Sequence, residues 1–87
     1  MSIIIYLSIT RVRFDHMKTS LRRYRFEKGE LSQQQVAEMV GVSRQTIVAI
    51  ERGDYSPSVK LALLLAQSLD TTVEQLFKLE ERDHVQT

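Results

Sequence analysis

Residues 41–43, Gly-Val-Ser, constrain the fold of this chain more than any other part of its 87-residue sequence. The segments on both sides have apolar residues at the three- and four-residue spacing of an α-helix. Glycine favours a helix end and serine favours an N-cap, so Gly41 ends one predicted helix and Ser43 begins the next. Because the turn is so short, the two helices cannot run antiparallel, and we expect them to cross near a right angle. Their inward positions are Val36, Ala37 and Val40 before the turn, and Ile47 and Ile50 after it.

The sequence after residue 17 predicts five helices joined by short loops. Residues 32–35, Ser-Gln-Gln-Gln, form a capping box, in which the serine and the third glutamine satisfy each other's backbone N–H groups. Residues 72–75, Thr-Val-Glu-Gln, predict a second box. The expected helices are residues 20–28, ended by Gly29, the segments between Ser32 and Gly41 and between Ser43 and Gly53, residues 58–69, and a last helix begun by Thr72 with Val73, Leu76 and Phe77 inside.

The composition indicates one globular, all-α domain. The chain is 43% hydrophobic and 26% charged and has no cysteine, which argues against a disulfide-stabilised scaffold and against a thiolate zinc site. A core this small is marginal and often depends on oligomerisation. The formal net charge is +1, but the first 30 residues carry +4 and the last 27 carry −3. A chain charged in this way can turn its basic end toward a polyanion.

The first residues differ in character from the rest, so we divide the chain into an extension at 1–17, a domain at 18–79 and a polar tail at 80–87. Residues 2–14 are rich in β-branched and aromatic residues and predict a strand. That strand could pair with a second copy or lie over a helix, or the segment could lack order. The alternative is that residues 1–16 are an addition of cloning or of start-site choice, since Met17 precedes a complete domain.

Several classes of function find no support in the sequence. The longest apolar stretches, residues 3–7 and 61–66, fall far short of a membrane span. Residues 1–9 make a poor signal peptide, with no basic n-region and no A-x-A-like site after them, so we expect a cytoplasmic protein. His16 and His84 are far apart and have no metal-ligand spacing. We therefore expect no enzyme activity, no metal and no cofactor.

The stretch from Leu31 to Gly53, LSQQQVAEMVGVSRQTIVAIERG, resembles the lambda repressor/Cro-like helix-turn-helix family, also called the XRE family. The resemblance covers about residues 20–78 and includes Ala37, Gly41 and Glu51 at the family's positions. It implies a five-helix DNA-binding fold. It also implies a regulator of transcription that binds double-stranded DNA, and we expect a homodimeric repressor acting on an inverted-repeat operator.

The resemblance implies that the first turn of the second helix of the motif reads bases in the major groove. Arginine suits guanine and glutamine suits adenine, each through two hydrogen bonds. One turn further on, this chain has only apolar atoms, which could contact a thymine methyl group. The residues expected to read bases are Arg44, Gln45, Thr46, Val48 and Ala49.

A second set of residues is implied to hold the DNA backbone. Gln33 begins the first helix of the motif, where free N–H groups attract a phosphate. Ser43 is a helix cap in any case, and the remaining residues lie in or after the loop that follows the reading helix. The set is Gln33, Ser43, Arg52, Tyr55, Ser56, Ser58 and Lys60. The resemblance gives Arg22 and Arg23 no place on the DNA face.

One pair of residues has an implied structural role. Arg25 and Glu51 match the family's buried ion pair, although the chain has one extra residue, Glu30, before Leu31.

Leu63 and Leu64 occupy positions that are usually polar in the family, so they predict an apolar patch. The patch fits a homodimer contact, and the alternative is that residues 3–7 of the same chain cover it. A competing function is that of an antitoxin or bridging cofactor, which acts mainly by binding a protein partner, toxin-like or other.

Overall fold

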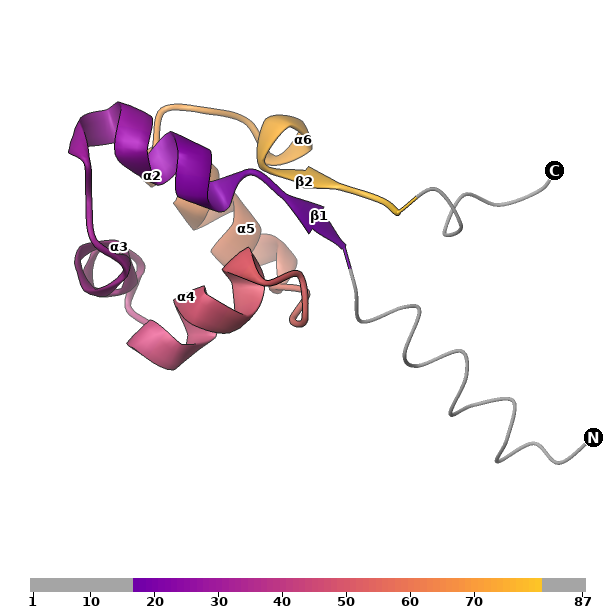
Figure 1. The fold of residues 1–87 in the computed structure, drawn as a ribbon, viewed down its shortest axis with the longest axis horizontal. Coiled ribbons are helices and arrows are strands. Elements are labelled where there is room, and N and C mark those ends of the chain that lie inside the picture. The colour runs from indigo at the N-terminus through magenta and orange to yellow at the C-terminus, as the bar shows by residue number, and fades with distance from the viewer. Residues whose placement is uncertain (1–16, 81–87) are drawn as a thin grey trace, which may run out of the picture.

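The computed structural model describes residues 17–80, and the strand and extension expected at residues 1–16 lie outside them, as do residues 81–87 of the tail. Within the described residues the fold is mostly helical, with five helices and one short strand pair, as the sequence predicts apart from the strands (Figure 1). The elements are β1 (Lys18–Thr19), α2 (Leu21–Gly29), α3 (Gln33–Val40), α4 (Arg44–Glu51), α5 (Val59–Ser68), α6 (Val73–Leu76) and β2 (Phe77–Lys78).

Hydroxyl side chains fix where four of the helices begin. Ser32, Ser43, Ser58 and Thr72 each accept a hydrogen bond from the backbone N–H three residues later. Such a cap satisfies a donor that the first turn of a helix leaves unpaired. The capping box at Ser32 is complete, since the Gln35 side chain accepts from the Ser32 N–H at 2.8 Å.

The second predicted capping box, at Thr72, forms only in part. Thr72 Oγ1 accepts from the Gln75 N–H at 3.1 Å. The side-chain oxygen of Gln75, Oε1, does not accept from the Thr72 N–H. It accepts instead from the hydroxyls of Tyr24 and Thr71, at 3.0 and 2.8 Å. The tertiary contact with α2 therefore replaces the second half of the box.

The last helix is shorter than the sequence suggests, because the chain leaves it at Phe77. Phe77 has extended backbone angles and pairs with Thr19, while Lys78 pairs with Lys18, in an antiparallel ribbon. The Ser20 N–H also donates to the Leu76 carbonyl at 2.8 Å. The ribbon joins the two ends of the domain and lies at the end of the molecule away from α3 (Figure 1).

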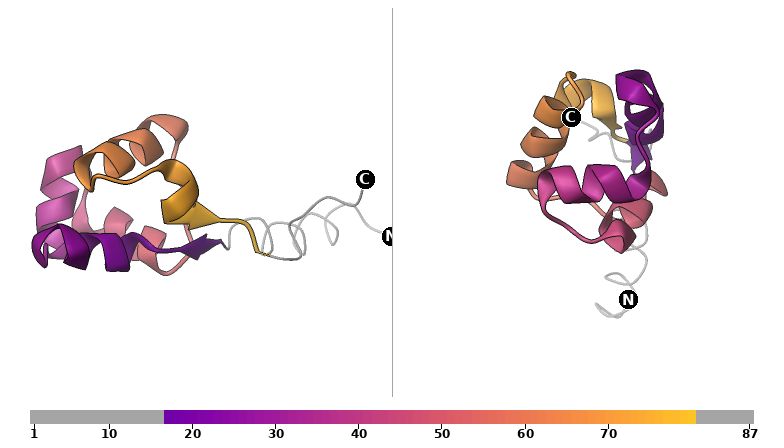
Figure 2. Two further views of the ribbon diagram at one scale, coloured as in Figure 1. Left: turned by 90° about the horizontal axis from the view of Figure 1, so that it is seen from above. Right: turned by 90° about the vertical axis from the view of Figure 1, so that its left-hand side faces the viewer.

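The turn between α3 and α4 has the geometry that its glycine predicts. Gly41 lies in the left-handed region at φ 76°, and the Val42 N–H donates to the Ala37 carbonyl at 3.0 Å. Figure 1 shows α3 almost end-on while α4 runs across the view, so the two helices cross. Both pack their inward faces into one core, and α5 closes that core from the other side (Figure 2). The buried apolar residues are Leu21, Val36, Ala37, Val40, Ile47, Ile50, Leu61, Ala62, Leu65, Ala66, Leu69 and Leu76.

Helix α2 ends one residue later than its glycine suggests. Gly29 is still inside α2, at φ 148°, and Glu30 takes the left-handed cap position at φ 53°. The Leu31 N–H donates to the Arg25 carbonyl, six residues back, whereas Val42 donates to Ala37 only five residues back. The extra residue is thus absorbed in the turn, and Arg25 keeps its place on α2.

Candidate nucleic-acid interface

The first turn of α4 presents polar side chains to solvent. Arg44 and Gln45 are exposed, and Ser43 caps the helix beneath them. Thr46 is half-buried, and its hydroxyl lies 3.0 Å from that of Ser43. Because Ile47 is fully buried, α4 is anchored with this turn facing outward. The two longest side chains of the turn are therefore the ones that can reach a ligand.

The second turn of α4 offers less to a ligand. Val48 and Ala49 are half-buried, not fully exposed as their position suggests. They have no side-chain donor or acceptor, so their contribution to reading a base is limited to apolar contact. Hydrogen-bonding capacity on α4 is concentrated in Arg44 and Gln45.

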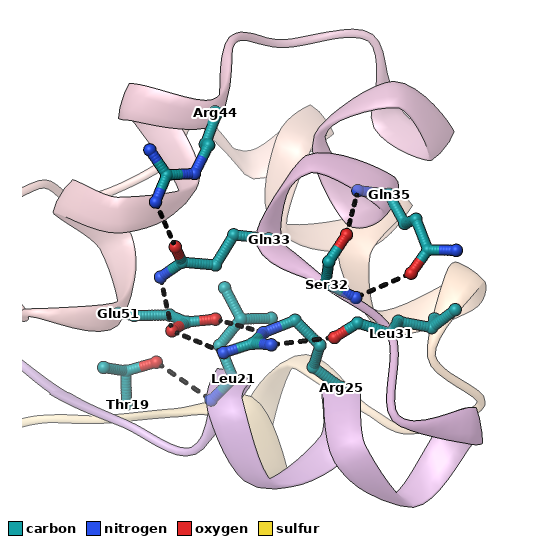
Figure 3. Close-up of polar contacts among 9 residues, drawn as sticks. All are labelled: Thr19, Leu21, Arg25, Leu31, Ser32, Gln33, Gln35, Arg44 and Glu51. Carbon is teal, nitrogen blue, oxygen red and sulfur yellow. Dashed lines mark hydrogen bonds and ion pairs between the residues drawn. The ribbon is translucent and has the colours of Figure 1, made fainter.

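Gln33, the first residue of α3, connects this surface to the interior (Figure 3). Its side-chain NH₂ donates to Glu51 Oε1 at 3.1 Å, and its carbonyl oxygen accepts from Arg44 Nη2 at 3.3 Å. The family resemblance implied only a phosphate contact for Gln33. The structure places the Gln33 side chain between Arg44, the first residue of α4, and Glu51, the last.

Arg25 and Glu51 form a buried ion pair with two contacts. Arg25 Nε lies 2.7 Å from Glu51 Oε2, and Nη2 lies 3.1 Å from Oε1, with side-chain exposures of 8% and 9%. Arg25 Nη1 also donates to the Leu31 carbonyl at 2.7 Å. A charge pair removed from water in this way needs such additional hydrogen bonds. The pair ties α2 to the end of α4 and fixes both against the turn before α3.

The loop between α4 and α5 carries the remaining predicted backbone contacts. Arg52 is exposed and pairs with Asp54 at 3.3 Å, so a phosphate would have to compete with that carboxylate. The Ser58 hydroxyl accepts from the Leu61 N–H at 3.1 Å as the N-cap of α5. The other three predicted residues are exposed: Tyr55, Ser56 and Lys60.

Arg22 lies beside the residues at the start of α3 and α4, a position that the sequence did not predict. An open cleft of about 400 Å³ is lined by Arg22 together with Gln33, Gln34 and Arg44. Arg23, by contrast, pairs with Glu27 at 2.9 Å, and this hydrogen bond and charge raise the pKa of the Arg23 guanidinium. The i,i+4 spacing of Arg23 and Glu27 is a sequence signal for this pairing, and Arg22 has Phe26 at the same spacing. The packing of α2 against α4 brings Arg22 to the cleft.

An apolar groove lies on another part of the surface, between α5 and α6. It has a volume of about 960 Å³, and its lining includes Leu63, Val59, Val73 and Phe77. Leu63 is 57% exposed and Val59 77% exposed. Leu64, however, is half-buried and packs against the core, so the expectation of two adjacent exposed leucines is correct only for Leu63.

Residues 17–80 show neither a membrane-spanning helix nor a metal-binding cluster. No helix in that part of the chain is long and apolar enough to span a membrane. No group of three or more histidine, cysteine or acidic side chains gathers there as a metal site would require.

Comparisons with known proteins give a consistent picture. A family model described as Helix-turn-helix matches residues 21–76. The chain is 48% identical over 66 residues to a Methanothermobacter thermautotrophicus protein named an uncharacterized HTH-type transcriptional regulator, covering 75% of this chain and 94% of the relative. It is 43% identical over 67 residues to the similarly named YgzD of Bacillus subtilis, covering 77% of this chain and 100% of the relative.

Solved structures agree with these relatives. The chain superposes on the restriction-modification controller protein C.AhdI from Aeromonas hydrophila with a TM-score of 0.60 and 35% identity, covering 79% of this chain and 98% of the other. The clp gene regulator ClgR from Corynebacterium glutamicum matches with a TM-score of 0.56 and 30% identity, over 61% of this chain and 55% of that one.

Proposed function

The chain belongs to the lambda repressor/Cro-like helix-turn-helix family of DNA-binding transcriptional regulators, and from this we propose that it reads a specific operator as a homodimer and represses transcription. The observation that carries the proposal is the exposure of Arg44 and Gln45 on the first turn of α4, above a fully buried Ile47. This is the turn of a recognition helix that meets base edges in the major groove. Since the target is DNA, we place the protein in the cytoplasm with the chromosome.

The exposed residues fall into two chemical groups, one suited to base edges and one suited to the DNA backbone, and this supports the assignment. Arg44 and Gln45 have the paired donors and acceptors that distinguish guanine and adenine. Gln33, Ser43, Arg52, Tyr55, Ser56, Ser58 and Lys60 are proposed to position the duplex through its phosphates, and Arg22 joins them from α2. Val48 and Ala49 are proposed to add apolar contact with a thymine methyl group. Thr46, on the same first turn as Arg44 and Gln45, is proposed to contact a base as well.

The homodimer is proposed to form at the apolar groove of α5 and α6. Exposed Leu63 and Val59 beside a groove of about 960 Å³ are the kind of surface that a second copy would cover. A two-fold dimer would present two α4 helices to successive major grooves, about 34–36 Å apart. Repression then follows from occupancy of an operator with two inverted half-sites.

The test is selection of binding sites from a random duplex pool at near-physiological salt, with the full chain as bait. We expect a two-fold symmetric site to be enriched. An Arg44→Ala/Gln45→Ala variant, checked for folding by circular dichroism, serves as the control and should lose the enrichment.

The competing function, an antitoxin or bridging cofactor, draws on the same groove, because an apolar surface of this size also suits a protein partner. Absence of any enriched site with a folded, wild-type chain would contradict sequence-specific reading and leave this function as the better account.

A further inference from the structure

We propose that Phe26 is a positioning residue, which holds the Arg22 guanidinium over the polar cleft at the starts of α3 and α4, where that guanidinium binds a phosphate of the DNA backbone. The proposal rests on the proposed function and deepens it, because it names the aromatic ring that orients the phosphate contact of α2. The observation is that Arg22 and Phe26 both line the cleft, with Arg22 Cζ 5.6 Å from the centroid of the Phe26 ring.

Phe26 is an aromatic side chain in polar surroundings. It is 44% exposed, lies outside the apolar core, and lines a cleft whose other residues are all polar or charged. Two guanidinium groups lie over the ring, those of Arg22 and Arg25, at 5.6 and 5.0 Å from its centroid. The face of an aromatic ring attracts a cation at such distances. Phe26 therefore contributes to the cleft by holding cations and not by packing in the core.

The two arginines over the ring differ in what they can offer a ligand. Arg25 is buried, and its donors go to Glu51 and to the Leu31 carbonyl. Arg22 is exposed, and no carboxylate of residues 17–80 forms an ion pair with it. Arg25 thus fixes one side of the ring from the interior, and the ring in turn restrains Arg22 at the surface.

The charges of the cleft suit an anion. The guanidinium groups of Arg22 and Arg44 both line it. Among residues 17–80 its lining includes one carboxylate, Glu51, which already accepts from Arg25 and from the Gln33 amide (Figure 3). A guanidinium group can bind two phosphate oxygens through parallel N–H bonds. Because Arg44 begins the base-reading turn, the phosphate bound by Arg22 belongs to the duplex beside that turn.

An aromatic ring restrains an arginine without using up its charge. The contact is made through the face of the ring, so it takes none of the five N–H donors of Arg22. Arg52 is held differently, by the Asp54 carboxylate at 3.3 Å, which a phosphate would have to displace. An arginine side chain that is already ordered also loses less entropy on binding. The ring therefore prepares Arg22 for a phosphate and leaves all its donors available.

The experiment is a salt titration of DNA binding by the full chain, on the selected operator and on a random duplex. Arg22→Ala removes one phosphate contact, so the slope of log K against log salt should flatten by about 1 on both duplexes. Phe26→Leu keeps an apolar side chain but removes the ring. It should weaken binding to both duplexes about two- to fivefold, the size of one exposed cation–π contact. Phe26→Tyr keeps a ring face and should restore the affinity of the wild type.

The double variant Arg22→Ala/Phe26→Leu separates positioning of Arg22 from support of the fold. If the ring acts through Arg22, the double variant should bind DNA no more weakly than Arg22→Ala alone. Urea denaturation of each variant checks that it is folded under the conditions of the titration.

The matched control is Arg23→Ala. Arg23 is the neighbouring arginine on α2, and its guanidinium lies 5.1 Å from the centroid of a different ring, that of Tyr24. It pairs with Glu27 and does not line the cleft. The salt slope should therefore stay that of the wild type.

A measurement on the free protein tests the orientation of Arg22 by itself. Nitrogen relaxation of the Arg22 Nε–H group should show greater mobility in Phe26→Leu and no change in Arg23→Ala. The inference is overturned if Arg22→Ala keeps the wild-type salt slope, if Phe26→Leu weakens binding equally with and without Arg22, or if Phe26→Leu leaves the mobility of Arg22 unchanged.

Failure of the proposed function gives a different result. A wild type that binds the random duplex but selects no operator contradicts sequence-specific reading, while the salt titration on the random duplex still tests Arg22. A folded wild type that binds neither duplex defeats the phosphate contact together with the proposed function, and the relaxation data then report separately whether Phe26 orients Arg22.

Discussion

At the scale of single residues, the side chains of this domain divide into those that hold the fold and those that are proposed to face DNA. Arg25 and Glu51 are buried together, while Arg44 and Gln45 are exposed. Gln33 touches both groups. Substitutions at these positions should consequently separate effects on stability from effects on binding.

Arg44→Ala should change specificity. Loss of a bidentate arginine–guanine contact costs about 1–3 kcal/mol of discrimination at one base pair. Competition binding with single-base variants of the selected operator measures it. An equal loss of affinity for every duplex would contradict the base-reading role of Arg44.

Arg52→Ala should change affinity without changing specificity. A phosphate contact acts alike on all sequences, so binding should weaken uniformly and the slope of log K against log salt should flatten by about 1. A salt titration on specific and random duplexes checks this. Because Asp54 already pairs with Arg52 at 3.3 Å, Asp54→Ala is the matched variant and should strengthen binding. If the Arg52→Ala slope equals that of the wild type, Arg52 does not contact a phosphate.

Arg25→Met should destabilise the fold. It leaves Glu51 buried without its partner, which costs about 3–5 kcal/mol of the free energy of unfolding. Urea denaturation followed by circular dichroism measures the loss. Arg23→Ala is the control, because the Arg23–Glu27 pair is exposed to solvent and should contribute little.

At the scale of secondary-structure elements, the turns decide how the helices are directed. α3 and α4 cross because Gly41 adopts a left-handed conformation and Ser43 caps the next helix at once. α2 ends differently, with Glu30 in the left-handed region at φ 53°. The same backbone conformation is thus occupied by glycine at one helix end and by glutamate at another.

Gly41→Ala should lower the free energy of unfolding by about 1–2 kcal/mol, the cost of a side chain in the left-handed region. A Cβ at this position would meet nothing within 4 Å, so the effect comes from backbone strain and not from a clash. Chemical denaturation gives the value. An unchanged midpoint would mean that the turn can relax without cost.

Glu30→Gly should do the opposite. Glycine relieves the left-handed strain at φ 53° but loses more entropy on folding, which leaves a net gain of about 0.5–1 kcal/mol. Thermal unfolding of the variant beside the wild type checks this, and a lower melting temperature would show that the Glu30 side chain makes a stabilising contact.

At the scale of the whole molecule, the surfaces proposed for DNA and for a second copy are separate. The cleft beside Gln33 and Arg44 is polar, whereas the groove beside Leu63 and Val59 is apolar. The ribbon of β1 and β2 joins the two ends of the domain at the end away from α3. This separation would let a dimer form at the apolar groove while the polar cleft binds DNA.

Leu63→Glu/Val59→Glu should convert the proposed dimer into a monomer, because two charges would be buried at the interface. Light scattering measures the mass. Leu64 is left unchanged because it packs against the core, and Met39→Glu, a change at a 47% exposed position on α3, is the control. A monomeric wild type, or a variant that keeps the dimer mass, would contradict an interface at this groove.

The sequence by itself determined the helices, their order and the family. Four helix starts depend on a local signal, because Ser32, Ser43, Ser58 and Thr72 cap N–H groups three residues later. The end of α3 depends on another, because Gly41 turns the chain. The exposed first turn of α4 follows from the same local periodicity, since Ile47 must face the core.

The tertiary structure decided whatever depends on residues far apart in the chain. Phe77 leaves the helix because Thr19, 58 positions earlier, offers a strand partner, and Gln75 turns to Tyr24 instead of completing its capping box. The contacts of Gln33 with Glu51 and Arg44 likewise join positions that no local pattern relates. Hydrogen bonds of this kind depend on where packing brings two backbones together, and spacing along the sequence does not encode that distance.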